Sequence, residues 1–110
     1  MNMRNGLYKV TFGTPLGSGT GVVYALDGKI RGGDSMIAYV GEYATDGDQM
    51  SAVVITDAHS NVPGMISVLG PSKAQINLVG KTSGDTVTCQ GASPQAPGVT
   101  FKATLQRIAD

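Results

Sequence analysis

Turn signals divide this sequence into short runs of alternating polar and apolar residues, and their spacing limits the fold more than any other feature. The runs are rich in β-branched and aromatic residues and recur about every ten residues. No window of about a dozen residues has the apolar repeat of ~3.6 residues that an amphipathic helix needs. The pattern predicts an all-β chain of about eight strands, each with one buried and one solvated face.

The first and last predicted strands, residues 7–12 and 99–106, alternate most clearly. Their inward side chains are predicted to be Tyr8, Val10, Phe12, Val99, Phe101, Ala103 and Leu105. Further strands are predicted over residues 65–69, 74–79 and 86–90, and residues 92–98 are predicted to form an irregular loop.

The pair Asp27-Gly28 predicts a two-residue hairpin turn between residues 20–26 and 29–31. Asp-Gly supplies the positive φ angles of a type I′ turn. Directly opposed residues share a face of the sheet, so counting outward from the loop points Val23, Ala25 and Ile30 inward. The outer face of the hairpin then has three apolar members, Val22, Tyr24 and Leu26.

The pair Asp46-Gly47 predicts a second hairpin with these two residues at the centre of its turn. The count pairs Tyr43 with Met50 and collects the polar residues of both strands on one side, which supports the two-residue loop. The tip consists of Thr45, Asp46, Gly47 and Asp48. Turn chemistry alone accounts for Asp and Gly at such a tip, and recognition of a protein partner is the alternative.

Glycines inside predicted strands, such as Gly21 and Gly41, cost about 0.5–1 kcal/mol each relative to alanine. They predict bulges or sharp bends, which a small meander needs in order to close into a barrel. Closure also removes the unpaired edges on which a β-rich chain aggregates. We predict a single antiparallel up-and-down β-barrel.

Length and charge exclude several classes of protein. With 110 residues the chain supports one core, so we expect one domain over residues 1–110. The formal net charge is +0 and no Lys/Arg run is present, which argues against direct binding of nucleic acid. No apolar stretch approaches the ~20 residues of a membrane span, the first residues lack the apolar run of a signal peptide, and the single Cys89 cannot form an internal disulfide. We expect a cytoplasmic protein.

Residues for catalysis or metal binding are sparse. His59 is the only histidine, and its neighbours Asp57 and Ser60 do not establish the geometry of a triad. One His and one Cys are too few for zinc, and the tip aspartates lack the spacing of a calcium loop. The glycine-rich residues 17–21 lack the Lys and the helix of a phosphate-binding loop and are predicted to be a flexible connection. We expect no catalytic residue, no metal and no cofactor.

The order of four segments resembles a known family. The segments are Asn5-Gly6-Leu7-Tyr8, the hairpin over residues 19–28, Gly32-Gly33-Asp34 and Tyr39-Val40-Gly41-Glu42. Over about residues 5–54 they resemble the GrlR-like negative regulators of type III secretion from the locus of enterocyte effacement. The resemblance implies a small lipocalin-like (calycin-like) barrel, a homodimer, and a negative regulator of transcription that sequesters a helix-turn-helix activator.

In that family an exposed Glu-Asp-Glu-Asp motif is implicated in binding the activator. It falls at the tip of the second hairpin, where Asp46 and Asp48 match and both glutamates are absent. The resemblance therefore implies that Thr45, Asp46, Gly47 and Asp48 bind a protein. Exposed apolar side chains often mark an interface, so Val22, Tyr24 and Leu26 are predicted to face a second copy.

Two other functions stay open at this point. Inward Ala and Gly residues, together with flexible methionines such as Met36 and Met50, could leave a cavity for a small apolar ligand. Only two Phe and no Trp are available as aromatic anchors, which argues against such a carrier. An enzyme is the weakest interpretation, because no His, carboxylate and nucleophile converge.

Overall fold

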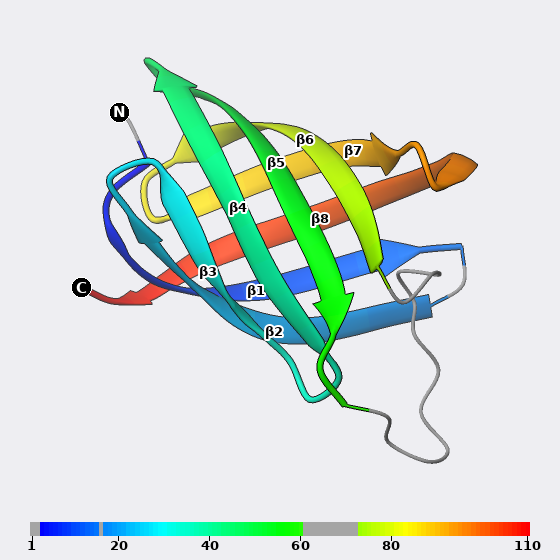
Figure 1. Ribbon diagram of the computed structural model, residues 1–110. Helices are drawn as coiled ribbons and strands as arrows, with labels where there is room; N and C mark the ends of the chain where they lie inside the picture. Colours follow the sequence, from blue (N-terminus) through cyan, green and yellow to red (C-terminus); the bar gives the residue numbers. More distant parts are fainter. Residues whose placement is uncertain (1–2, 16, 61–72) are drawn as a thin grey trace.

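The computed structural model describes residues 3–15, 17–60 and 73–110, and within these ranges the chain forms eight strands and no helix. The strands are β1 (Gly6–Thr14), β2 (Gly17–Leu26), β3 (Lys29–Gly33), β4 (Ile37–Asp46), β5 (Gln49–Ala58), β6 (Lys73–Ser83), β7 (Thr86–Ser93) and β8 (Ala96–Ala109). Each strand is antiparallel to the next and β8 pairs with β1, so the sheet closes into an up-and-down barrel (Figure 1). The predicted barrel is confirmed; the strand predicted over residues 65–69 lies outside the described residues.

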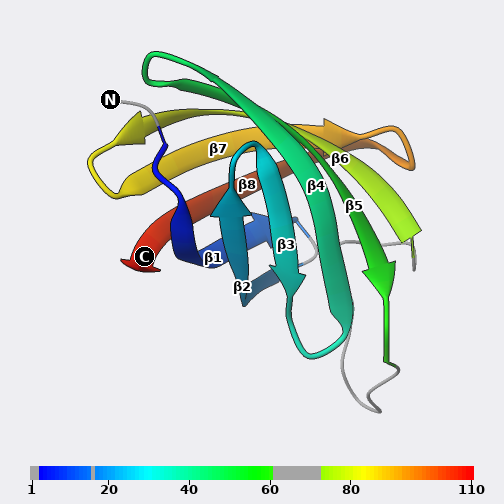
Figure 2. The ribbon, with the colours of Figure 1, turned by 60° about the vertical axis from the view of Figure 1, so that its left-hand side comes forward.

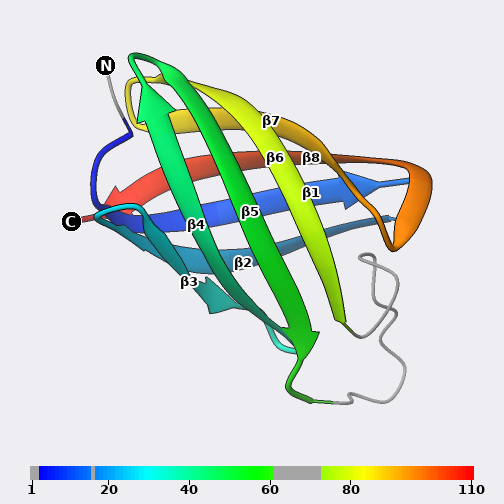
Figure 3. The ribbon, with the colours of Figure 1, turned by 45° about the horizontal axis from the view of Figure 1, so that its top comes forward.

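The barrel is flattened, with principal extents of 40 × 28 × 19 Å. β4 and β5 cross over β8 and β1, which lie on the far side of the core (Figures 1 and 3). The start of β1 and the end of β8 lie at one end, together with the β2–β3, β4–β5 and β6–β7 turns (Figures 1 and 2). We call this the terminal end of the barrel.

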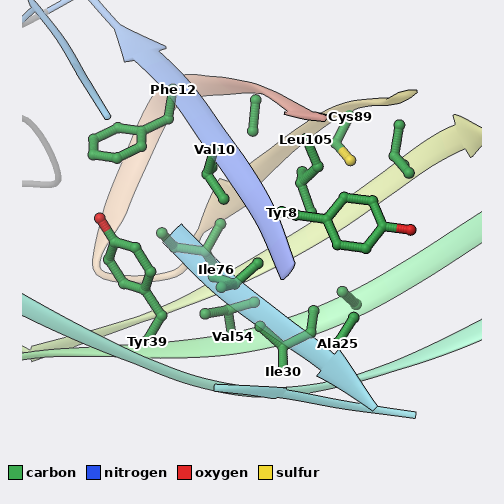
Figure 4. Packing of buried hydrophobic residues seen from close by; sticks show 14 of the residues in the cluster. Tyr8, Val10, Phe12, Ala25, Ile30, Tyr39, Val54, Ile76, Cys89 and Leu105 are labelled. Carbon is green, nitrogen blue, oxygen red and sulfur yellow. The ribbon is translucent and has the colours of Figure 1, made fainter. Parts of the chain in front are cut away.

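Inward side chains from all eight strands meet in one apolar core. Figure 4 shows Phe12 and Tyr39 side by side at one end of this core, Tyr8 at the other, and aliphatic side chains such as Ile76 between them. The Phe12 and Tyr39 rings meet edge to face, with centroids 6.2 Å apart and an interplanar angle of 88°. The inward residues predicted for the first and last strands are buried, except that Val99 is only partly buried.

Two glycines of β2 make room for these rings. A Cβ on Gly19 would lie 2.8 Å from the Phe12 ring, and a Cβ on Gly21 would lie 3.1 Å from the Tyr39 ring. Residues 17–21 are part of β2, so the prediction of a flexible connection is wrong. The register of β2 and β4 is unshifted against their neighbours, so the prediction of bulges at Gly21 and Gly41 is also wrong. Here the glycines serve close approach, because rings and backbone from other strands occupy the missing side chains' space.

The first hairpin has the predicted register. Leu26 pairs with Lys29 around Asp27 and Gly28, whose φ angles of 50° and 86° are both positive, as a type I′ turn requires. The predicted inward residues Val23, Ala25 and Ile30 are buried.

The second hairpin differs from its prediction in register. Asp46 pairs with Gln49, so the turn consists of Gly47 and Asp48 rather than Asp46 and Gly47. Gly47 has a φ of 62° and Asp46 keeps a negative φ, which matches the first-position glycine of a type II′ turn. The shift moves the pairing by an even number of residues, so the predicted inner and outer faces are nevertheless confirmed.

Residues 92–98 are more regular than the predicted loop. β7 continues to Ser93 and β8 begins at Ala96, which leaves a two-residue turn. Ser93 Oγ donates to Gln95 Oε1 at 3.2 Å, and Gln75 N donates to the same oxygen at 2.9 Å. These side-chain hydrogen bonds, one of them from a different hairpin, hold the turn.

Residues 3–5 cover the core at the terminal end. Met3 is 6% exposed and packs with the core residues. Asn5 exchanges two hydrogen bonds with Asp27: Asn5 Nδ2 donates to Asp27 Oδ1 at 3.1 Å, and Asp27 N donates to Asn5 Oδ1 at 3.0 Å. Arg4 forms an ion pair with Asp85 at 3.0 Å. The segment is thus attached to two hairpin turns.

Candidate protein-binding surface

The tip of the β4–β5 hairpin projects at the terminal end of the barrel (Figure 1). Of the predicted tip residues, Gly47 and Asp48 form the turn, and Thr45 and Asp46 are the last two residues of β4. Asp46 continues the outward side of β4 and is exposed, and its carboxylate has no hydrogen bond or ion pair with any other described residue. Asp46 therefore presents an uncompensated negative charge to solvent.

Asp48 differs from Asp46 because β6 contacts it. Its carboxylate lies 3.7 Å from Lys81 Nζ, and its carbonyl accepts a hydrogen bond of 2.7 Å from Thr82 N. The sequence interpretation missed Lys81, since nothing local to the tip indicates which strand lies beside it. The tip carries one free acid and one partly compensated acid.

The outer surfaces of β2, β4 and β5 carry exposed apolar side chains. The predicted outward residues Val22, Tyr24 and Leu26 are 45%, 40% and 49% exposed. Val40 and Val53 are 47% and 46% exposed and continue this surface onto β4 and β5. The complete set, which we call the apolar outer face, is Val22, Tyr24, Leu26, Val40, Val53 and the half-buried Ile55.

The sequence interpretation missed the half of this face that β4 and β5 supply. The signal was present, because alternation places Val40 in phase with the outward Glu42 and Val53 in phase with the outward Ser51. Their position relative to β2 depends on strand order, which places Tyr24, Arg31 and Val40 directly opposite one another. The tertiary structure therefore places the two apolar strips on one face, on either side of the exposed Lys29 and Arg31 of β3.

The outer surface of β6 to β8 is mainly polar. Thr88 and Thr104 are directly opposed, as are Gln90 and Lys102 in the next row. Among the described residues, five of the seven exposed large apolar side chains lie on β2, β4 and β5. Val79 lies on the adjacent β6 and lines the same surface depression as Val53, and Ile108 lies on β8. The exposed apolar residues are thus concentrated on one side, which is typical of an interaction surface.

His59 has a structural role at the end of the barrel away from the termini. Its ring Nε2 lies 2.9 Å from the Asp34 carbonyl and its Nδ1 lies 2.8 Å from Ser60 Oγ. Among the described residues, Asp57 makes no hydrogen bond with this ring. The histidine therefore bridges two loops rather than forming part of a triad.

Asp34 organises the same end. Its Oδ1 accepts hydrogen bonds from Met36 N at 2.8 Å and Ile37 N at 2.7 Å, and its Oδ2 accepts one from the Tyr39 hydroxyl. Burial, with the Asp34 carboxylate as the second cause, raises the pKa of Tyr39 far above its ordinary value. The hydroxyl therefore keeps its proton and acts as a donor.

Metal sites and membrane-spanning helices are absent from the described ranges. No group of three or more His, Cys, Asp or Glu residues within them could hold a metal ion. In the same part of the chain, no helix is long and apolar enough to cross a membrane.

The barrel interior contains a narrow cavity of about 80 Å³. Its wall is almost entirely apolar and includes Phe12, Ile30, Tyr39 and Phe101. Pockets that bury drug-sized ligands are larger, at about 300–1,000 Å³. Side chains therefore fill most of the space that a carrier would need.

Cys89 packs in the core as a small apolar residue, 4% exposed. Burial raises the pKa of its thiol to about 11, whereas a thiol in an unfolded chain ionises near ~8.5. The folded state keeps this proton where the unfolded state loses it, so the stabilisation is complete below about pH 8.5 and is lost as the pH rises toward 11.

We therefore expect the free energy of unfolding to fall by about 1–2 kcal/mol between about pH 8.5 and 10, and we expect Cys89→Ala to show a smaller fall. Chemical denaturation at several pH values measures both slopes. The buried Tyr8 and Tyr39, whose pKa values are also raised by burial, are common to both proteins. Equal slopes would contradict the role of the Cys89 thiol.

A comparison with models of known protein families finds no match, and a search for similar curated proteins finds none either. The resemblance to the GrlR-like family therefore rests on the four segments quoted above. The closed eight-stranded barrel is compatible with the small lipocalin-like barrel that the resemblance implies.

Proposed function

We propose that this protein is a non-enzymatic regulator that binds another protein through the tip of the β4–β5 hairpin. The observation that supports the proposal is the uncompensated carboxylate of Asp46, which projects at the end of the barrel and continues the line of the outward Glu42. An exposed acid of this kind favours a basic partner. The free, buried Cys89 thiol is in keeping with a reducing cytoplasm.

The resemblance to GrlR-like proteins supports a more specific proposal. In it the partner is a helix-turn-helix activator, and its sequestration represses transcription of type III secretion genes. The basic DNA-contacting surface of such an activator is complementary to the acidic tip. The apolar outer face supports a homodimer, in which Val22, Tyr24 and Leu26 contact the second copy.

The test is to replace both tip acids, Asp46→Asn with Asp48→Asn, and to measure binding to purified helix-turn-helix activators of the same organism. Exposed charge pairs contribute about 0–1 kcal/mol each, so we expect the dissociation constant to rise about 3- to 30-fold. Isothermal titration calorimetry at low and high salt measures the change and its electrostatic origin.

Asp57→Asn is the matched control, because it removes one exposed carboxylate from the opposite end of the same hairpin. Binding should be unaffected by this change. If the doubly substituted tip binds as tightly as the original protein, the acidic tip has no part in the mechanism.

A carrier of a small apolar ligand is the second candidate, and the apolar wall of the internal cavity favours it. With a volume of about 80 Å³ the cavity admits a ligand of only a few heavy atoms unless Phe12 or Tyr39 moves. Native mass spectrometry of freshly purified protein distinguishes the two functions. A reproducible bound mass would favour the carrier.

A further inference from the structure

One row of outward side chains across β2 to β5 has apolar residues at its two ends and opposite charges between them. Leu26, Lys29, Glu42 and Val53 lie directly opposite one another across β2, β3, β4 and β5. All four are exposed, and within the described residues neither Lys29 nor Glu42 has an ion-pair partner. Across the strands the row runs apolar, cationic, anionic, apolar.

Such a row is complementary to a reversed copy of itself. When two copies are laid face to face with the strand order of one reversed, Lys29 of each copy lies over Glu42 of the other. Leu26 of each copy then lies over Val53 of the other. The neighbouring row is Tyr24, Arg31, Val40 and Ile55. The same operation lays Tyr24 over Ile55 and Arg31 over Val40, so this row pairs its outer apolar side chains but contributes no pair of opposite charges. An isologous interface needs this self-complementarity, because the same patch serves both subunits.

We propose that two copies of this chain pack through the apolar outer face about a two-fold axis that runs parallel to the strands, between β3 and β4. The inference rests on the homodimer proposed above and adds its orientation. β3 of each copy then covers β4 of the other, and β2 covers β5. Packed sheets of this kind lie about 10 Å apart with strand directions within roughly 30°.

The alternative two-fold axis, perpendicular to the strands, is disfavoured by charge. It would place β3 over β3, so that Lys29 and Arg31 of one copy faced the same cations of the other. Like charges that face each other across an interface oppose association. The distribution of charge on the face therefore selects the axis parallel to the strands.

The size of the face limits the strength of this dimer. Four strands about 4.8 Å apart, each contributing some six residues of ~3.3 Å, cover roughly 15 by 20 Å. This contact, about 300 Å² on each copy, is smaller than the ~600 Å² per partner of a stable specific interface and is in the range of weak, reversible association. We expect a reversible dimer with a dissociation constant in the micromolar range.

Charge reversal tests the orientation. Lys29→Glu puts two carboxylates over each other at both symmetric contacts, and Glu42→Lys does the same with two cations. Each variant alone should raise the dimer dissociation constant at least about tenfold, measured by analytical ultracentrifugation. An equimolar mixture of the two variants should associate again, and so should the chain that carries both changes.

The outcomes separate the orientation from the dimer itself. If the wild-type chain stays monomeric at high micromolar concentration, the homodimer is overturned. If it dimerises but the single charge changes leave the dissociation constant unchanged, only the orientation is overturned. A doubly changed chain that stays monomeric also overturns the orientation, because the parallel axis would restore opposite charges at both contacts. None of these three results bears on activator binding by the tip. Lys102→Glu, on the polar outer surface of β8, is the matched control and should leave the dissociation constant unchanged.

Cross-linking gives a second measurement that does not depend on charge. In a Cys89→Ala background, Leu26→Cys and Val53→Cys chains should form a disulfide with each other when mixed, and neither should form one efficiently on its own. Leu26→Cys chains that link to one another more readily than to Val53→Cys chains would contradict the parallel axis. Circular dichroism confirms that each variant is folded.

Discussion

Replacing Tyr39 by alanine is expected to lower the free energy of unfolding by about 3–5 kcal/mol. Tyr39 is 5% exposed, its ring packs edge to face against Phe12, and it covers the backbone of Gly21. The substitution leaves a cavity beside Phe12 and Gly21, and Gly21 has no side chain that could fill it. Urea denaturation followed by circular dichroism measures the change.

Two further variants separate the contributions. Tyr39→Phe keeps the ring but leaves the Asp34 carboxylate without its hydroxyl donor, which should cost about 1–3 kcal/mol. Tyr24→Ala removes a tyrosine that is 40% exposed on the outer face and, in dilute monomeric protein, should cost under about 1 kcal/mol. If Tyr39→Ala cost no more than Tyr24→Ala, the packing of Tyr39 against β2 would be wrong.

Replacing Met3 by alanine is expected to cost about 2–5 kcal/mol, the second large effect. Met3 is 6% exposed although it precedes the first strand, because its side chain covers the core at the terminal end. Shortening it uncovers this end of the barrel to water. Urea denaturation measures the loss, and binding of a hydrophobic dye reports the exposed core.

Asn5→Ala is the control for this substitution. It removes the two hydrogen bonds to Asp27 while it leaves the Met3 side chain intact, and a typical hydrogen bond contributes about 0.5–1.5 kcal/mol. We expect Asn5→Ala to lower the free energy of unfolding by less than Met3→Ala does, and to cause no binding of the hydrophobic dye. A Met3→Ala chain as stable as the original would show that the core does not depend on this cover.

The inner and outer faces of the strands followed from local alternation, which requires no knowledge of the neighbouring strand. Tyr8, Val10 and Phe12 turn inward because every second residue of a strand points to the same side. The register of β4 and β5 did not follow in the same way, since Gly47 fits either the first or the second position of a tight turn. The observed turn places Asp48 where its carbonyl meets Thr82 N on β6, a contact that is not local.

The role of the strand glycines in close packing was not predicted, for a related reason. Considered within β2 alone, Gly21 predicts a bulge or a bend. In the structure the Tyr39 ring lies against the strand at this glycine. Which ring covers a glycine depends on the neighbouring strands and on the curvature of the closed sheet. A single strand contains neither piece of information.

The sequence by itself determined the class of fold, the first hairpin with its register, and the presence of apolar side chains on the outside of β2. These features depend on φ preferences at Asp27-Gly28 and on alternation, both of which act within a few residues. Only the tertiary structure decided that Asp46 is unpaired while Asp48 meets Lys81, and that Val40 and Val53 extend the apolar face of Tyr24. The reason is that strand order and closure bring together residues distant in the chain, and the charge and polarity of a surface depend on those neighbours.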